Sequence, residues 1–494
     1  MRLWVAVYLP HLALEAYFPR HLPDPCCAIV EGQHVMAMSD SARREGVRHG
    51  MGRGGVLMLA PHTVILERDI VREEDCLDAI AMALLQYTPE VTHFEESVLL
   101  MNVGASLTLF GGVRRLCSRI SADMRALGFT GRISCAPTAR GAWVLARGAG
   151  RPRTLKMLTL QRRLGPVPVS VLPPARRFSV WLDGIGCTTV GELRRLPRPG
   201  LQRRCGRELL EVLDAAYGLS TELHNWIEPP EVFRARIEIF DRVEKADELL
   251  AGGHRLILQM LGWLTARQLA VRRIVLEMIH ERGRVARPPS TLEITLADPV
   301  WRDDHLVRLL KERLGRQVLE APVIGLVLEA TDVVPMAPPS ESLFPDPGGS
   351  EEDQQQLLEV LMARLGAENV LRPDPKADYR PEFANAWASI STPVRPGQLE
   401  AALPPNVDQF IRPTWILAKP IPLLMRDDRP YYSSPLKIVS KPERIEAGWW
   451  STAQSRDYFI AEADDKVFYW IYRERVATED GTVEPRWFLH GMFG

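Results

Sequence analysis

Apolar and polar positions alternate along the first 137 residues in a pattern that predicts short strands joined by amphipathic helices. Runs with a two-residue period predict strands over 2–9, 27–31, 34–38, 91–95, 98–103 and 131–136. Runs with helical spacing predict helices just after Pro10 and over 39–46, 71–87 and 113–127. Apart from an insertion at 39–70, the order is β-α-β-β-α-β, which predicts a small α+β sheet domain.

The pattern changes twice in the middle of the chain. Residues 138–230 are helical, basic and interrupted by proline and glycine. The segment 234–333 then returns to a β-α-β-β-α-β order. Its strands are predicted near 236–240, 272–280, 290–297 and 322–330, and its helices near 246–269 and 303–317. We therefore expect a second four-stranded sheet with two helices on one face.

The last third of the chain is less regular. Residues 334–353 are rich in proline and glycine and cannot bury a core, so they predict a linker. The segment 354–412 is expected to hold one helix, near 354–366, and a second loose stretch. Residues 413–494 are rich in aromatic side chains, and Asp480-Gly481 is a hairpin signal. This predicts a small β-rich domain whose aromatic residues form its core.

Composition narrows the class of protein. A chain of 494 residues with 46% hydrophobic and 25% charged residues is typical of a soluble protein of three or four domains. No apolar run approaches the roughly 20 residues that a membrane span needs. The first segment is apolar only up to Pro10, which favours a buried strand over a signal peptide and predicts a cytoplasmic protein. The seven cysteines have no C-x-x-C pairing and no histidine at ligand spacing, so reduced thiols and no metal site are expected.

A basic block lies inside a chain whose net charge is only −1. Between Arg147 and Arg207, 14 Arg or Lys residues face two acidic ones, Asp183 and Glu192. Such a block is typical of phosphate binding. A solvated face, or an ion-pair partner for another domain, remains the alternative.

A candidate DNA-binding motif lies within this block. Residues 182–186 (Leu-Asp-Gly-Ile-Gly), followed by 188–193, are similar to a helix–hairpin–helix. Glycines allow the N–H groups of such a turn to face a phosphate, and the next helix points its positive end the same way. A glycine-rich turn between packed helices is the alternative. The predicted DNA-binding residues are Gly184, Ile185, Gly186, Arg194, Arg195, Arg203 and Arg204.

Several motifs carry a resemblance to a known family. Residues 41–47 (Ser-Ala-Arg-Arg-Glu-Gly-Val), the acidic pair Glu95-Glu96 after a strand, and the 184–186 turn occur in the order found in Y-family DNA polymerases of the DinB/UmuC type. The resemblance implies a palm at 1–38 and 71–137, fingers at 39–70, a thumb at 138–230 and a little finger at 234–333.

Motifs near the end of the chain resemble a more specific family. Residues 441–450, 456–459, 472–475 and 487–491 resemble the C-terminal domain of the ImuB family. Its members are the polymerase-like proteins of a bacterial SOS mutagenesis cassette. The resemblance implies that 413–494 is a protein-interaction domain.

The Y-family resemblance also implies which catalytic groups are missing. Ala6 stands where the family's metal-bridging Asp belongs, while Glu95 and Glu96 keep the later acidic pair. The family's nucleotide-binding Tyr-x-x-Arg reads Asp40 to Arg43, which leaves Arg43 as a weak nucleotide-binding candidate. His11 stands at the position of the aromatic steric gate. We therefore expect no polymerase activity and no cofactor.

Two alternatives stay open at this point. One is an active translesion polymerase that uses Glu95, Glu96 and an unidentified carboxylate, for which Mg²⁺ would be required. The other is a helix–hairpin–helix DNA-repair protein with no link to the sliding clamp.

The linker contains a candidate clamp-binding peptide, with Leu343-Phe344 as its apolar pair and Ser340 in the place of the usual leading Gln. The family resemblance implies four partners for a nucleoid-associated cytoplasmic protein. They are DNA, the β sliding clamp, a RecA-like accessory protein of the ImuA type and an error-prone C-family DNA polymerase.

Overall fold

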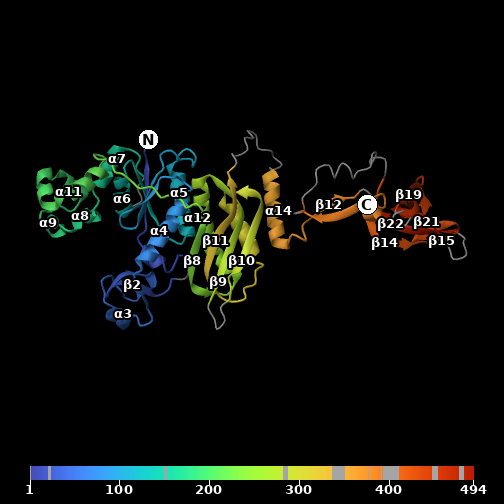
Figure 1. Cartoon of the computed structure of the whole chain (residues 1–494), viewed down its shortest axis with the longest axis horizontal. Coiled ribbons are helices and arrows are strands. Elements are labelled where there is room, and N and C mark those ends of the chain that lie inside the picture. Colours follow the sequence, from blue (N-terminus) through green and yellow to red (C-terminus); the bar gives the residue numbers. More distant parts are fainter. Residues whose placement is uncertain are drawn as a thin grey trace. The chain divides into compact units, whose positions relative to one another are not determined.

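The chain folds into two compact units, Met1–Val360 and Leu361–Gly494, in the computed structural model (Figure 1). The structure describes residues 2–20, 24–148, 153–281, 287–336, 351–376, 378–390, 392, 411–447, 454–477 and 483–493. No helix among these residues is both long and apolar enough to cross a bilayer.

The predicted palm is a four-stranded antiparallel sheet in the order β5-β6-β1-β7. Its strands are β1 (Trp4–Tyr8), β5 (Val91–Phe94), β6 (Val98–Asn102) and β7 (Arg132–Ala136). Its helices are α1 (Leu12–Glu15), α4 (Ile70–Leu84) and α5 (Val113–Ala126). Alternate residues of β1 enter different cores, because successive side chains of a strand point to opposite faces. Val5 and Val7 pack with α4 and α5, whereas Trp4 and Ala6 pack with the helix after β7.

The insertion is larger than predicted. The hairpin β2 (Cys27–Glu31) and β3 (His34–Met38), which we assigned to the palm, instead joins β4 (Val64–Glu67) in a separate sheet, β3-β2-β4. Helices α2 (Asp40–Arg44) and α3 (Arg53–Leu59) complete this fingers subdomain. The palm assignment of 27–38 was therefore wrong, because parallel pairing with β4 offers the hairpin a small core of its own.

The thumb is helical, as its pattern predicted. Most of its apolar residues share one buried cluster with palm residues Trp4 and Ala6, so thumb and palm are continuous. The helices are α6 (Ala139–Arg147), α7 (Met157–Leu164), α8 (Pro173–Arg176), α9 (Ser179–Gly184), α10 (Val190–Arg195) and α11 (Arg198–Ala216), with a 3₁₀ turn η1 (Val169–Val171).

The little finger has the predicted β-α-β-β-α-β order, with both helices on one face of its sheet. Its strand order is β10-β9-β11-β8, which differs from that of the palm. The repeat is therefore one of element order and not of strand pairing. The elements are β8 (Arg234–Val243), η2 (Ala246–Leu249), α12 (Leu250–Arg267), β9 (Leu269–His280), β10 (Ser290–Val300), α13 (Asp303–Leu314) and β11 (Val323–Pro335).

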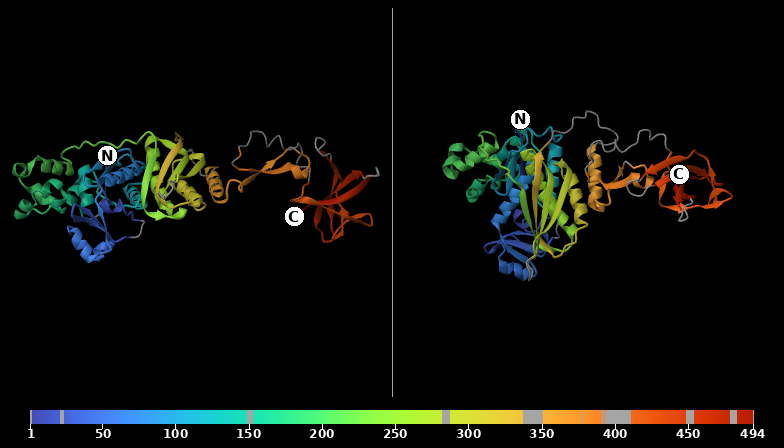
Figure 2. Two further views of the ribbon diagram at one scale, coloured as in Figure 1. Left: turned by 60° about the horizontal axis from the view of Figure 1, so that its bottom comes forward. Right: turned by 45° about the vertical axis from the view of Figure 1, so that its right-hand side comes forward.

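Helix α12 also joins the little finger to the palm. One side of α12 lies on strands β8, β9 and β11, and the other lies on α4 and α5 (Figures 1 and 2). Nine consecutive residues of α12, Leu256 to Leu264, are buried. A helix that is apolar on all sides is expected to be enclosed by protein on all sides, and α12 is.

Two features follow the little finger. Helix α14 (Glu351–Leu365) begins three residues before its predicted start at 354. Glu359 accepts a hydrogen bond from the Ala297 N–H at 2.5 Å, and its other carboxylate oxygen contacts His305 Nε2. The segment predicted as helix and linker, 354–412, also contains β12 (Leu371–Pro375), α15 (Pro381–Ala384) and β13 (Asn385–Ser389). Our expectation of only one helix there was wrong, because β12 and β13 pair with each other.

The second unit is β-rich, as expected. Six strands form one sheet, and β15, β16 and β17 form a smaller one. The predicted aromatic core is present, since Tyr458, Trp470 and Tyr472 are each at most 3% exposed. The hairpin signal Asp480-Gly481 lies outside the described residues. The strands are β14 (Trp415–Pro422), β15 (Leu424–Arg426), β16 (Arg429–Tyr432), β17 (Ser434–Pro435), β18 (Lys437–Ile438), β19 (Glu443–Ala447), β20 (Gln454–Glu462), β21 (Phe468–Ala477) and β22 (Val483–Met492).

Candidate nucleic-acid interface and polymerase-like site

The acidic pair predicted from the sequence lies in the tight turn between β5 and β6. Glu96 and Ser97 take left-handed backbone conformations, with φ of 57° and 59°. Non-glycine residues seldom adopt this region, so the turn is sharply constrained. The Leu9 N–H donates to the Ser97 carbonyl oxygen at 3.0 Å, which fixes the turn beside the end of β1. Both carboxylates are thereby held next to the central strand of the palm.

Three arginines engage these two carboxylates. Arg140 Nη1 lies 2.9 Å from Glu95 Oε1. Glu96 forms an ion pair with Arg147 and accepts two bonds from Arg176, Nη1 to Oε1 at 2.5 Å and Nη2 to Oε2 at 3.1 Å. The side chains of Arg140 and Arg147 are only 11% and 13% exposed. The two bonds from Arg176 are charge-assisted, and such paired bonds are among the stronger hydrogen bonds in proteins.

Ala6 lies in the middle of β1 and is fully buried. Its neighbours across the sheet are Leu100 and Ser134. It shares a buried cluster with Trp143 of α6, whose Nε1 donates to the Glu95 carbonyl oxygen at 3.1 Å. The position that the family resemblance assigns to a metal-bridging carboxylate is therefore a methyl group packed under a helix.

These residues do not fit a pair of Mg²⁺ ions. Two-metal catalysis needs carboxylate oxygens that bridge cations about 3.5–4 Å apart. Ala6 offers no oxygen, and guanidinium groups already hold the carboxylates of Glu95 and Glu96.

The other family positions lie elsewhere. His11 and Asp40 line a cavity of about 550 Å³ between palm and fingers. Arg43 forms an ion pair with Asp40 at 3.5 Å on the exposed face of α2, so its charge is partly matched within its own helix. Glu95 and Glu96 line a different cavity, of about 860 Å³, between palm and thumb. The two cavities share no lining residue.

The palm–thumb cavity is acidic. Six carboxylates and three arginines line it, and each arginine already forms an ion pair with one of those carboxylates. Arginines beside the lining match further charges, since Arg147 and Arg176 pair with Glu96 and Arg177 pairs with Glu208. The acidic residues are Glu95, Glu96, Glu208, Glu211, Asp214 and Glu222, and the basic ones are Arg140, Arg198 and Arg207.

The predicted hairpin forms, but its backbone donors do not face outward. The N–H groups of Ile185, Gly186 and Cys187 donate to carbonyl oxygens of α9. At the start of α10, the Thr188 and Thr189 N–H groups donate to the Glu192 carboxylate, both at 2.9 Å. These bonds lower the pKa of Glu192. Our expectation that the turn N–H groups would face a phosphate was therefore wrong, since a capping box already uses those of α10.

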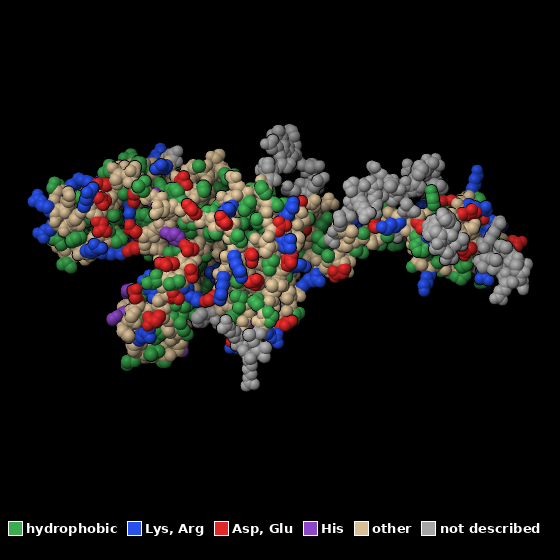
Figure 3. Space-filling model, in the orientation of Figure 1, with side chains coloured by type: hydrophobic (Ala, Val, Ile, Leu, Met, Phe, Trp, Pro, Cys, Tyr) green, Lys and Arg blue, Asp and Glu red, His purple; other side chains and the backbone are tan. Residues whose placement is uncertain are grey.

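The predicted thumb arginines remain available as cations. Arg177, Arg198 and Arg207 pair with Glu208, Asp214 and Glu211. Four further arginines are exposed and form no ion pair with a described residue: Arg194, Arg195, Arg203 and Arg204. These four arginines are called the thumb arginine quartet below. Figure 3 shows Lys and Arg side chains gathered at the end of the thumb formed by α9 and α11.

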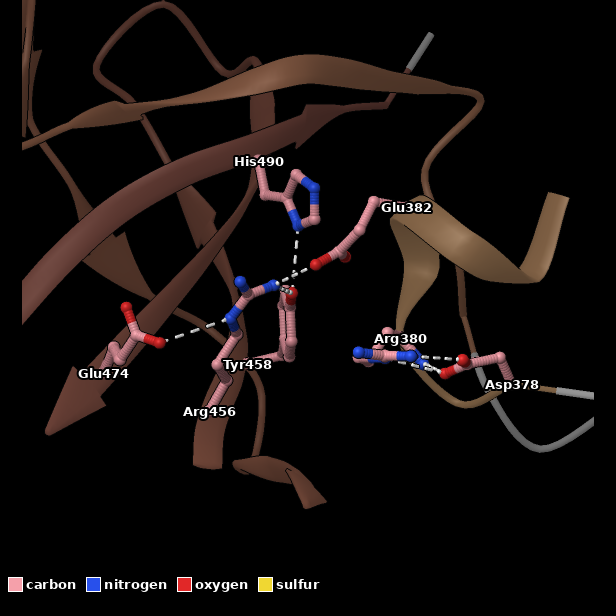
Figure 4. A network of polar contacts seen from close by, with 7 residues as sticks. All are labelled: Asp378, Arg380, Glu382, Arg456, Tyr458, Glu474 and His490. Atoms are coloured by element: carbon pink, nitrogen blue, oxygen red, sulfur yellow. Dashed lines mark hydrogen bonds and ion pairs between the residues drawn. The ribbon is translucent and has the colours of Figure 1, made fainter. Parts of the chain in front are cut away.

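The second unit contains a buried polar network (Figure 4). The Tyr458 hydroxyl accepts from Arg456 Nη1 at 3.3 Å and lies 2.9 Å from His490 Nδ1. Arg456 also pairs with Glu382 at 2.9 Å and with Glu474 at 3.7 Å. Burial lowers the pKa of His490, which favours a neutral ring whose Nδ1 can accept a hydrogen bond from the Tyr458 hydroxyl. The network ties the 378–384 segment to the six-stranded sheet.

Sequence reasoning missed the arginines that hold Glu95 and Glu96. One signal was available in the spacing of Arg140 and Arg147. The two arginines are seven residues apart, which is about two turns of a helix, so both lie on the same face of that helix. Arg176 lies 80 residues from Glu96 and gave no local signal. The predicted clamp-binding residues Ser340, Leu343 and Phe344 lie outside the described residues.

Part of the chain is similar to a known protein family. Residues 13–147 match the impB/mucB/samB family, a segment that covers most of the palm and fingers and α6. Among solved structures, the chain is similar to a Dbh ternary complex, at 15% identity over 68% of this chain and 100% of that one, with a TM-score of 0.37. It is also similar to DinB from Sulfolobus solfataricus, at 14% identity, 68% and 100% coverage and a TM-score of 0.37.

A more particular relative covers nearly the whole chain. Protein ImuB of Caulobacter vibrioides, from strains NA1000/CB15N and ATCC 19089/CIP 103742/CB 15, is 25% identical over 464 residues. The match spans 91% of this chain and 100% of the relative. The resemblance to ImuB that the sequence motifs predicted is thereby confirmed.

Proposed function

We propose that this chain is a catalytically inactive Y-family polymerase homologue that serves as a DNA- and clamp-binding adaptor for error-prone translesion synthesis in the SOS response. The observation that carries the proposal is the set of ion pairs at the β5–β6 turn. Arg140, Arg147 and Arg176 hold the two carboxylates on which a polymerase would depend. Polymerase chemistry there would require breaking these pairs and supplying a further carboxylate.

DNA binding is assigned to the outer thumb. The palm–thumb cavity is lined by twice as many carboxylates as arginines, whereas the thumb arginine quartet is exposed. Exposed cations attract phosphate over distances up to about 10 Å at ordinary salt. We therefore propose that the thumb contacts the DNA backbone through these side chains, with the little finger as a second contact.

The adaptor role rests on tethering. A clamp-binding peptide at 340–344 and an interaction domain at 413–494 would hold an ImuA-type protein and an error-prone C-family polymerase close to DNA. Linking weak binding sites in one chain makes later binding events intramolecular and raises the effective concentration of each partner. The resemblance of 441–491 to ImuB supports this assignment.

Primer extension tests the loss of catalysis. The purified full chain, given primer–template, four dNTPs and either Mg²⁺ or Mn²⁺, is expected to yield no more product than its Glu95→Ala plus Glu96→Ala variant, because Ala6 offers no metal ligand. A matched variant, Glu208→Ala plus Glu211→Ala, removes two carboxylates from the same cavity without touching the turn. Extension that disappears only in the Glu95/Glu96 variant would establish the active polymerase instead.

Clamp capture tests the adaptor role. Immobilised β sliding clamp is expected to retain the chain and to lose at least tenfold in affinity for the Leu343→Ala plus Phe344→Ala variant, because that change removes the apolar pair that fills the clamp pocket. Leu219→Ala plus Leu223→Ala, at two exposed positions of the thumb, provides the control. Equal retention of all three proteins would mean that the assignment of the tether is wrong. Absence of retention, even of the unaltered chain, would favour the repair protein that has no link to the clamp.

A further inference from the structure

Three donor side chains of different chemistry converge on the fingers subdomain. The Cys26 thiol, a Glu45 carboxylate oxygen and a His62 ring nitrogen all lie within 4.8 Å of one another. His62 Nε2 is 2.8 Å from Glu45 Oε1, and Cys26 Sγ is 3.2 Å from the Thr63 hydroxyl. Sequence spacing gave no hint of this, since the three residues are separated by 19 and 17 positions.

The fold explains why they meet. Strands β2 and β4 are parallel and begin side by side, with Cys27 opposite Val64. Cys26 immediately precedes β2 and His62 stands two residues before β4, so both lie at the same end of the paired strands. The Val64 N–H donates to the Cys26 carbonyl oxygen at 2.9 Å, which locks the two strand starts together. Glu45 ends α2, where its N–H donates to the Ser41 carbonyl oxygen at 3.3 Å. Each donor thus stands on a fixed backbone.

We propose that Cys26, Glu45 and His62 bind a zinc ion. Thiolate, imidazole and carboxylate are the three side-chain ligand types that Zn²⁺ uses in proteins. Tetrahedral zinc needs donor atoms about 3.5 Å apart, which small side-chain rotations can reach from a spread of 4.8 Å. A fourth position is left for water or for another ligand.

The surroundings favour a cation. Among the described residues, Glu45 has no lysine or arginine partner, and its only ion-pair contact is His62. The His62 and Glu45 side chains are 65% and 33% exposed, so an ion can enter from solution. The neighbouring thiol is a poor competitor, because Cys27 is fully buried whereas Cys26 is partly exposed. Cys26 therefore supplies the accessible sulfur.

The proposed ion has a structural role. Among the described residues, one buried cluster of the fingers contains seven residues, all of them alanine or valine. A core this small supplies little stability, and a metal that joins separate segments is a common remedy. Here the ion would connect the end of α2 to the starts of β2 and β4.

Cobalt titration tests the proposal on the full chain. The reduced, chelator-treated protein is expected to bind one Co²⁺ with a thiolate-to-cobalt charge-transfer band in the near ultraviolet, and Zn²⁺ is expected to displace it. Cys26→Ser should abolish the band, and His62→Gln should weaken binding at least tenfold. Cys76→Ser is the matched control, because Cys76 is also a half-buried thiol, whose pKa burial raises to about 11.

Three outcomes decide the matter. A band that Cys26→Ser removes and Cys76→Ser keeps supports the site. Absence of a band in the unaltered chain, or a band of equal affinity in His62→Gln, overturns it. If Cys26→Ser fails to fold, His62→Gln still tests the site, because His62 is an exposed side chain whose replacement disturbs no core.

Discussion

Replacing the thumb arginine quartet with glutamine is expected to lower the affinity of the full chain for duplex DNA by about 10²- to 10³-fold at about 0.1 M salt. Each phosphate neutralised by a cation releases counterions, so the logarithm of the affinity falls by about 0.9 per contact for each tenfold rise in salt. Loss of four contacts should therefore also flatten the salt dependence by about 3 to 4. Fluorescence anisotropy across a salt series measures both quantities.

A matched control uses arginines of the same subdomain that already have partners. Arg177, Arg198 and Arg207 pair with carboxylates of α11, so their replacement by glutamine should remove few phosphate contacts. We expect a loss below about tenfold and a nearly unchanged salt slope. If the control variant loses as much affinity as the quartet variant, the basic block acts only through its total charge. A salt response that is flat in the unaltered chain would assign these arginines to protein contacts.

The thumb illustrates what the sequence could predict and what it could not. The helices around residues 182–193 follow from their glycines and apolar spacing. The role of the backbone N–H groups did not follow from the motif, because they find partners inside the hairpin. One signal was readable: Thr189 and Glu192 have the spacing of a capping box, which places a carboxylate at the helix start. That carboxylate takes the place that a phosphate would need.

The fingers show the same limit for strand pairing. The bounds of β2 and β3 were predicted to the residue, because alternating apolar positions and a turn at Gly32 define a hairpin locally. Which sheet the hairpin joins depends on β4, a four-residue strand whose pairing is set by tertiary contacts. The loss of the carboxylate at Ala6 was visible in the sequence through the family resemblance. The arginines around Glu95 and Glu96 were not, because such contacts appear only when distant segments pack.

A substitution in helix α12 tests how the little finger is attached to the palm. At Gly262 the helix touches the backbone of α4: a Cβ placed there would lie 1.8 Å from the Met82 carbonyl oxygen and 3.0 Å from Ala83 Cα. Backbone atoms inside a helix cannot yield as a flexible side chain can. Any side chain at position 262 must therefore push α12 and α4 apart, which would loosen the contact between little finger and palm.

Gly262→Val is accordingly expected to destabilise the first unit by about 3 kcal/mol or more and to lower its midpoint of thermal unfolding by about 4 °C or more. Gly200→Val is the matched control, since Gly200 is also helical and a Cβ added to it would have no atom within 4 Å. Valine is at least as good a helix former as glycine, so the control should be neutral or slightly stabilising.

Limited proteolysis distinguishes a local defect from separation of the two subdomains. If α12 holds the little finger against the palm, Gly262→Val should release a protease-resistant little finger, because its own sheet still covers the opposite side of α12. The palm would meanwhile expose the apolar surface of α4 and α5, which α12 normally covers, in part with its residue Leu258. Equal unfolding midpoints and identical digestion of the Gly262 and Gly200 variants would mean that α12 and α4 are not in contact in solution.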